Sequence, residues 1–436
     1  YYLLTNKLIY KEVVVHPAML AFLVVIIAYI FSAFYNGFGS ESIYIILKLF
    51  LSYVFAIIMI QFIMQEGFKS LLNSFLFFSL LLSAIYFYQI FTHYSDIMSI
   101  KVDWRRKYEF DAIAATMGNK NLLSSIQFLM LPILIHILYT GNRVLKISSG
   151  IAIILFLITI FQTQTRTVLF ALGIFSISFF SLNKKKLNNK YFIRLLIGSA
   201  LLFGSSYAVM KYTNKIDSFI IEIKKTLAFN SSERYILYDS TLRLIANHPV
   251  FGVGPGNWKI DVSNFDLYTK DRAYFKVGST FAQRPHSDFL WVFSEGGFIA
   301  GIAYILLFLI LLKDSYYLHK NRNDQDSIFY SLLFSCILGY GFISLVDFPL
   351  ERFSHNIIFF VLVSFIIAAK IKSTKTKISN VFKFLFFAVC CFSVYVASVR
   401  YNGELHLANA IQYKSKGDWK YVVKAIDKAY NKTYYE

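Results

Sequence analysis

Apolar runs long enough to cross a bilayer recur along the chain, separated by short polar or charged segments. A bilayer core of roughly 30 Å needs about 20 apolar residues in one helix. Runs of this kind predict spans at residues 18–36, 43–64, 71–91, 122–140, 147–163, 166–182, 192–210, 288–312, 328–346, 355–369 and 379–399. Gln162 to Arg166 should separate two of these spans, because an arginine at mid-membrane is costly. We therefore expect an all-α polytopic integral membrane protein with about 11–12 transmembrane helices and a large helical loop outside the membrane.

The composition leads to the same class. Hydrophobic residues make up 57% of the chain and charged residues only 16%, whereas soluble domains carry about a quarter charged residues. This excludes an ordinary soluble enzyme and a disordered protein. The three cysteines, Cys336, Cys390 and Cys391, all lie in apolar runs and make no disulfide framework.

Lysine and arginine gather in short loops that fall on one side of the predicted membrane. These residues are Lys7, Lys11, Arg143, Lys146, Lys184, Lys185, Lys186, Lys190, Arg194, Lys313, Lys320, Arg322, Lys370, Lys372, Lys375 and Lys377. The positive-inside rule makes this side cytoplasmic and leaves loops 92–121, 211–287 and 347–354 and the tail from 400 outside. Much of the net charge of +19 is therefore an orientation signal, and we expect no nucleic-acid partner.

The spans divide the chain into four parts. Residues 1–210 hold the N-terminal transmembrane helices, 211–287 a loop with amphipathic helices, 288–399 the C-terminal transmembrane helices, and 400–436 a soluble helical hairpin. The sequence starts at Tyr1 without a methionine and shows no cleavable signal, so we interpret it as part of a longer protein.

The soluble tail has the pattern of two helices joined by a turn at Gly417-Asp418. It is similar to one tetratricopeptide repeat. One repeat cannot bury its own apolar face, so we expect an incomplete repeat array or docking onto the membrane domain. A single amphipathic hairpin on the membrane surface is the alternative.

The long outer loop ends in a glycine-rich turn. A first amphipathic helix covers Lys215 to Phe229, and a second starts at Ser231 or Ser232 and stops at Asn247. The turn Gly252-Val253-Gly254-Pro255-Gly256 follows. It can be a phosphate-binding loop, but its spacing fits neither a P-loop nor a dinucleotide fingerprint, which favours a structural turn.

His286 is the candidate proton acceptor. The segment Arg284-Pro285-His286-Ser287 starts the span 288–312, so His286 lies at the interface, partly in water. There it can deprotonate an attacking hydroxyl, or it can simply cap the helix. Glu295 follows nine residues later, about 900° of helical rotation, and points away from His286 unless the helix kinks. Glu295 should therefore pair with another helix.

Two arginines are candidates for binding an anion. Arg166 starts a span at the outer side, where its charge opposes the helix dipole unless an anion is bound. Lipid phosphates can supply that anion, which is the alternative for Arg166. Arg234 is the second candidate, with a solvated helix position as its alternative. Asp347 lies in the next outer loop, where an ion pair with Arg352 is the alternative to a role in the site.

Together these motifs resemble the bacterial O-antigen ligase superfamily, which includes O-antigen polymerases and protein O-oligosaccharyltransferases. The resemblance covers residues from about 120 to 370. It rests on four motifs in this order. The first is Thr165-Arg166, and the second is Arg234 ahead of Asn247-His248-Pro249-Val250-Phe251-Gly252-Val253-Gly254-Pro255-Gly256. The third is His286-Ser287 with Leu290, Glu295 and Gly297, and the fourth is Leu345-Val346-Asp347-Phe348-Pro349-Leu350. The repeat-like tail is not part of the common ligase pattern, and it favours a protein as the acceptor.

The resemblance implies a metal-independent glycosyltransferase without a cofactor. Its site would face the periplasm from the bacterial inner membrane, and loop 211–287 would be periplasmic. Arg166 and Arg234 would bind the diphosphate of an undecaprenyl-diphosphate-linked glycan, with Asp347 as a further substrate-binding residue, and His286 would activate the acceptor hydroxyl. The acceptor would be the lipid A core, with membrane lipids around the site.

Three alternatives remain open from the sequence. A protein O-oligosaccharyltransferase would use a protein hydroxyl, and an O-antigen polymerase would use another lipid-linked glycan. A transporter of the lipid-linked glycan is the alternative that is not an enzyme. Transporters usually place charge near the midplane and show repeated halves, whereas here the distinctive polar residues lie at the outer interface.

Overall fold

The computed structural model describes residues 8–92, 113–163, 165–184, 233–267, 282–371, 375–377 and 380–433. Among these residues, nine helices are long and apolar enough to cross a membrane, which confirms an all-α polytopic membrane protein. They are α3 (Pro17–Asn36), α4 (Ser40–Glu66), α5 (Lys69–Thr92), α8 (Lys120–Thr140), α9 (Arg143–Thr163), α10 (Arg166–Asn183), α15 (Asp288–Asn321), α16 (Asp324–Val346) and α17 (Phe353–Lys370).

The remaining elements are not among these nine candidate spans. They are β1 (Leu8–Tyr10), α2 (Lys11–Val15), α13 (Glu233–Asn247), α14 (Trp258–Asp261), η2 (Val262–Asn264), η3 (Pro349–Glu351), β2 (Lys375–Lys377), α18 (Asn380–Ser415) and α19 (Trp419–Thr433). The two short strands pair antiparallel. The predicted span at 192–210 and the amphipathic helix at 215–229 lie outside the described residues, and the span at 379–399 forms the first part of α18, which is not among the nine.

Local sequence signals set several helix ends where they were expected. The break between two spans is confirmed, since α9 ends at Thr163 and α10 begins at Arg166. The hydroxyl of Ser124 in α8 bonds the hydroxyl of Thr163 at 2.8 Å, which satisfies polar groups at this break. The second helix predicted in loop 211–287, α13, ends at Asn247, as its sequence predicts.

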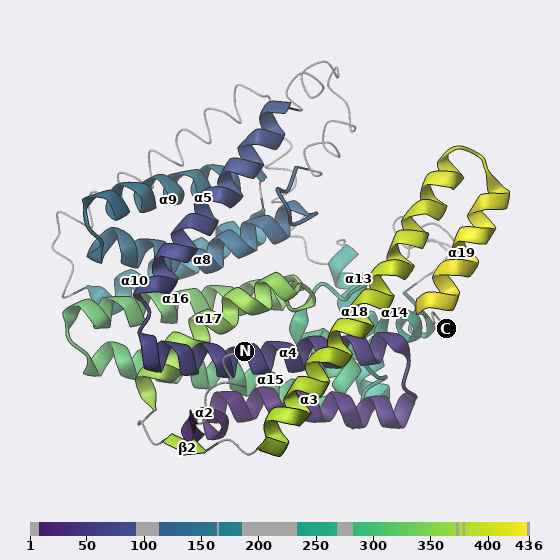
Figure 1. Ribbon diagram of the computed structural model, residues 1–436, viewed down its shortest axis with the longest axis horizontal. Helices are drawn as coiled ribbons and strands as arrows, with labels where there is room; N and C mark the ends of the chain where they lie inside the picture. The colour runs from purple at the N-terminus through teal and green to yellow at the C-terminus, as the bar shows by residue number, and fades with distance from the viewer. Residues whose placement is uncertain are drawn as a thin grey trace.

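The spans pack as a bundle in which distant segments lie side by side. Helix α15 packs against α3 and α16, α16 against α10, and α17 against α4 (Figure 1). Small hydroxyl residues allow close approach and bond across these contacts: the Ser32 hydroxyl of α3 donates to the Glu295 carbonyl of α15 at 2.6 Å.

Hydrogen bonds show which helix ends meet. Ser125 near the start of α8 bonds the His355 ring near the start of α17 at 2.8 Å. The Asp288 N–H at the start of α15 donates to the Asp347 carbonyl just after α16, at 3.2 Å. We call the end of the bundle that holds the starts of α8, α10, α15 and α17 and the ends of α9 and α16 the site end.

The C-terminal helices form a hairpin beside the bundle. Helix α18 runs through residue 400 without interruption, and α19 returns along it after Gly417 (Figure 1). Val422, Ala425 and Ala429 of α19 are buried. Arg400 of α18 bonds the carboxylate of Glu41 at the start of α4 at 2.7 Å, which joins the hairpin to the bundle near the site end.

Candidate functional site

The segment that carries His286 is tied to the segment that carries Asp347. Ser287 caps α15 by accepting a hydrogen bond from the Leu290 N–H. The buried Asp288 carboxylate accepts the Leu350 N–H at 3.1 Å. Together with the bond between Asp288 and the Asp347 carbonyl, this fixes the start of α15 against the loop after α16.

His286 has a strained backbone and a ring with two different sides. Its φ of 55° lies in the left-handed region, which residues other than glycine rarely adopt. Nδ1 is buried and lies 4.0 Å from the Asp347 carboxylate, while the side chain as a whole is 38% exposed. The exposed part of the ring therefore lies away from Nδ1, and the Phe348 ring stands edge-on to the imidazole with 4.8 Å between centroids.

Helix α13 brings Arg234 and Tyr238 to the same place. The two residues are four apart and share one face of the helix. The Tyr238 hydroxyl donates to the His286 carbonyl at 2.9 Å. The charge of Arg234 acts on Tyr238, His286 and Asp347, so all three lie within its electrostatic reach.

The electrostatics of this group keep the imidazole neutral. Burial, and then the positive charge of Arg234, lower the pKa of His286 to about 4. Burial raises the pKa of Asp347, and Arg234 opposes that effect. Burial raises the pKa of Tyr238 to about 12, so its hydroxyl stays protonated as a donor. At neutral pH the ring of His286 is therefore able to accept a proton.

Arg166 lies at the same end of the bundle on another helix. Asn183 at the end of α10 bonds Ser331 near the start of α16 at 2.8 Å, so these helices run antiparallel. Phe170 of α10 meets Phe342 of α16, with 6.4 Å between ring centroids. Arg166 is one turn before Phe170, which places it level with the last turn of α16, just before Asp347.

The glycine-rich turn binds protein rather than exposing a phosphate cradle. The N–H groups of Val253 and Gly254 donate to the Ser294 and Glu295 carbonyls at 2.9 and 3.1 Å. Helix α15 is broken just beyond, at Gly297, with φ 72° and ψ −174°. The turn therefore completes the hydrogen bonding of a broken helix, as the structural interpretation of its spacing predicts.

The kink does not bring Glu295 to His286, because it lies beyond Glu295 in the chain. The Glu295 side chain is 1% exposed, and its carboxylate faces the backbone N–H groups of Gly256 and Trp258 in the segment of the glycine-rich turn. The expected contact with another helix is made instead by its carbonyl, which accepts the Ser32 hydroxyl of α3.

Sequence reasoning gave no separate role to Arg284. Its guanidinium is 11% exposed and lies 3.2 Å from the Glu351 carboxylate and 3.8 Å from that of Glu41. It stacks over the Trp291 ring at 4.8 Å. The proline next to Arg284 indicates a fixed turn. No local sequence pattern could predict its partners, because Glu351 lies 67 residues after Arg284 and Glu41 lies 243 residues before it.

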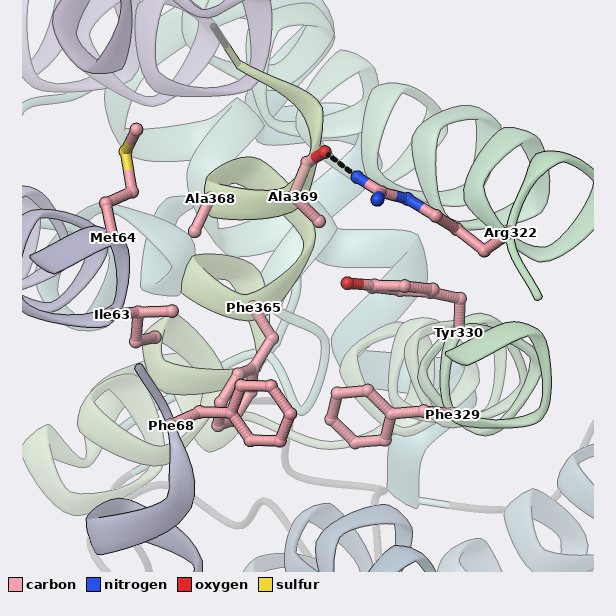
Figure 2. Close-up of a pocket in the computed structure, with 9 residues that line it drawn as sticks. All are labelled: Ile63, Met64, Phe68, Arg322, Phe329, Tyr330, Phe365, Ala368 and Ala369. Carbon is pink, nitrogen blue, oxygen red and sulfur yellow. Dashed lines mark hydrogen bonds between the residues drawn. The ribbon is translucent and has the colours of Figure 1, made fainter. Parts of the chain in front are cut away.

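A cavity of about 200 Å³ lies at the opposite end of the bundle (Figure 2). It is lined by Ile63, Met64, Phe68, Arg322, Phe329, Tyr330, Phe365, Ala368 and Ala369. Tyr330 precedes Asp347 by 17 residues, or about 26 Å along α16. This cavity is separate from the group around His286.

Comparison with known proteins identifies the central part of the chain. Residues 151–305, or 155 of 436, match the family model described as O-Antigen ligase. The match includes Arg166, Arg234 and His286, and Asp347 lies beyond it. The curated proteins gave no match. Residues 151–305 are therefore similar to an O-antigen ligase domain, consistent with the O-antigen ligase and polymerase superfamily that the motifs resemble.

Proposed function

We propose that this protein transfers a glycan from undecaprenyl diphosphate to an acceptor hydroxyl at the periplasmic face of the bacterial inner membrane, with the lipid A core as acceptor. One observation carries the proposal: in the region that matches the O-antigen ligase family, the buried Nδ1 of His286 lies 4.0 Å from the Asp347 carboxylate, and the charge of Arg234 acts on both residues. The orientation follows from the basic loops at the end of the bundle opposite His286.

His286 acts as the general base. Its other nitrogen, Nε2, takes the proton of the acceptor hydroxyl as the oxygen attacks the anomeric carbon of the sugar. The C–O bond to the diphosphate breaks, and the diphosphate leaves with the bonding electrons. Asp347 faces Nδ1, so it orients the ring and stabilises the imidazolium that forms.

Arg234 and Arg166 hold the departing diphosphate. Guanidinium groups bind phosphate oxygens in pairs and stabilise the charge that develops on the leaving group. A bound diphosphate also offsets the charge of Arg234, which raises the pKa of His286 from about 4 toward a value better suited to a base. Donor binding thus prepares the proton acceptor.

These roles use only side chains of the protein. We propose that transfer is independent of metal ions, because the arginines supply the positive charge that a metal would otherwise bring to the diphosphate.

A protein acceptor is the second candidate. The hairpin of α18 and α19 is joined to the bundle by the bond between Arg400 and Glu41, and Glu41 also contacts Arg284, two residues before His286. A repeat-like hairpin next to the site favours a peptide or protein substrate.

A reconstituted transfer assay tests the proposal. Wild-type protein and His286→Ala receive an undecaprenyl-diphosphate glycan, lipid A core and a peptide with free hydroxyls, and mass spectrometry identifies the product. His248→Ala is the matched control, an exposed histidine of the same region. Modified lipid A core that His286→Ala fails to make supports the proposal.

The other products have equally clear meanings. A glycosylated peptide identifies the protein transferase, and a longer lipid-linked glycan identifies the polymerase. If wild-type protein makes no product, a transporter becomes the better explanation. Full activity of His286→Ala would refute the role of His286.

A further inference from the structure

The proposed chemistry needs His286 and Asp347 to keep their relative positions, although they lie 61 residues apart on different segments. Among the described residues, direct hydrogen bonds tie these segments at Asp288, which follows His286, and the Tyr238 hydroxyl of α13 holds the His286 carbonyl. The left-handed φ of His286 persists only if the chain is also fixed on its other side. Arg284, two residues before His286, is in position to fix the chain on that side.

Arg284 reaches across to the loop after α16. Its guanidinium contacts the Glu351 carboxylate at 3.2 Å, with side-chain exposures of 11% and 25%. An ion pair this sheltered is screened less by salt and water than a surface pair. The contact therefore joins the segment before His286 to the loop that carries Asp347, four residues before Glu351.

Neighbouring groups hold both partners in place. The Trp291 ring lies under the Arg284 guanidinium at 4.8 Å, and the Glu41 carboxylate lies 3.8 Å away on another side. Lys48 of α4 donates to the Glu351 carbonyl at 2.9 Å, which fixes the short helix η3. Arginine suits this role because its planar group stacks and bonds at the same time.

We propose that the Arg284–Glu351 ion pair is a positioning device that holds His286 against Asp347. Arg284 and Glu351 are positioning residues that act through His286 and do not contact the reacting atoms. The expected effect of the ion pair on the transfer rate rests on the proposed function. Its expected effect on the distance between the two segments rests on the geometry alone.

Kinetics test the effect on rate. Glu351→Gln keeps the shape of the side chain and removes its charge, so kcat should fall by on the order of 10²-fold while the donor KM stays unchanged. Glu351→Asp keeps the charge and should recover part of the lost rate. Arg284→Gln should lower kcat similarly, and the double variant should be no worse than either single variant, because the two residues act as one pair.

An exposed ion pair of the same chemistry provides the control. Asp239 and Arg243 of α13 are 3.0 Å apart, with side-chain exposures of 36% and 54%, and they lie on a single helix. Asp239→Asn should leave kcat and KM unchanged. A raised donor KM in Arg284→Gln with unchanged kcat would overturn the proposal and make Arg284 a substrate-binding residue instead.

A distance measurement tests the geometry without any substrate. Spin labels are placed at Gln283→Cys and Arg352→Cys, both exposed positions, in full-length protein whose three native cysteines are replaced by serine. Dipolar broadening in frozen samples reports the distance between the segments. We expect broadening with Glu351 present, a clear loss with Glu351→Gln, and no loss with Asp239→Asn.

The two measurements separate the two ideas. Loss of broadening together with a lower kcat supports the positioning role. Unchanged broadening in a folded Glu351→Gln variant overturns it, as does loss of broadening with unchanged kcat. If wild-type protein has no transfer activity but the labels respond as expected, the proposed function fails and the ion pair stands as the link between the segments.

Discussion

Replacing Gly297 with alanine should disrupt the contact between the glycine-rich turn and α15. Gly297 has φ 72° and ψ −174°, a conformation that is essentially confined to glycine. An added Cβ would lie 2.0 Å from the Val250 carbonyl oxygen and 2.6 Å from its carbon. Both are backbone atoms, which cannot turn aside as the end of a side chain can.

The size of the effect follows from these two terms. The backbone conformation costs about 1–3 kcal/mol for a residue with a Cβ. Forcing an extra carbon into a filled site costs a further 1–3 kcal/mol or so. We therefore expect Gly297→Ala to lose about 2–6 kcal/mol of stability. If the turn instead moves away from α15, the hydrogen bonds between the turn and the helix are lost.

Gly173 in the middle of α10 is the matched control. Apart from its chain neighbours and the backbone of its own helix, no atom lies within 4 Å of a Cβ added there, and its backbone is helical. Gly173→Ala should be neutral or stabilising by about 0.5–1 kcal/mol, because alanine loses less backbone entropy on folding.

Thermal melting in detergent measures the difference. Trp258 of α14 and Trp291 of α15 are buried, and these two helices contact each other, so tryptophan fluorescence reports on this region. Gly297→Ala should melt well below wild type, and Gly173→Ala at or above it. Equal melting temperatures for the two variants would refute the prediction that the contact between the glycine-rich turn and α15 requires a glycine at 297.

The remaining predictions concern the charged groups around His286. Arg234→Gln removes a cation that disfavours imidazolium, so the pKa of His286 should rise from about 4 toward its ordinary 6.5, and the acid limb of the kcat/KM profile should move to higher pH. An unshifted limb would argue against His286 as the base. Asp347→Asn should lower kcat by on the order of 10²-fold at saturating donor, since the ring loses its orienting carboxylate; a wild-type kcat would exclude that role. Arg166→Lys should raise the donor KM about tenfold, because lysine cannot bind a phosphate in the bidentate manner, and an unchanged KM would place the diphosphate elsewhere. A chelator should leave the initial rate unchanged if transfer needs no metal ion, and recovery of a lost rate by an added divalent cation would contradict this.

The sequence by itself determined where the helices lie and where several of them end. The break between Thr163 and Arg166 and the end of α13 at Asn247 depend on residues within a turn or two. A charged group at mid-membrane is costly whatever its neighbours are, and an apolar run of about 20 residues spans the bilayer without help from distant contacts. The nine spans among the described residues follow from these local rules.

The sequence predicts that Glu295 points away from His286 on an ideal helix, but His286 itself lies before the start of α15 with a left-handed φ. Sequence reasoning did not foresee the break at Gly297, which comes from a turn inserted from more than 40 residues earlier.

Only the tertiary structure decided which side chains share the site. Asp347 faces His286, and Arg284 contacts Glu351, because α15 and α16 pack so that the start of one lies beside the end of the other. Residues more than 60 positions apart meet only through the packing of whole helices, and no local period or spacing encodes that packing. The sequence placed each residue on its own helix end, and helix packing brought those ends together.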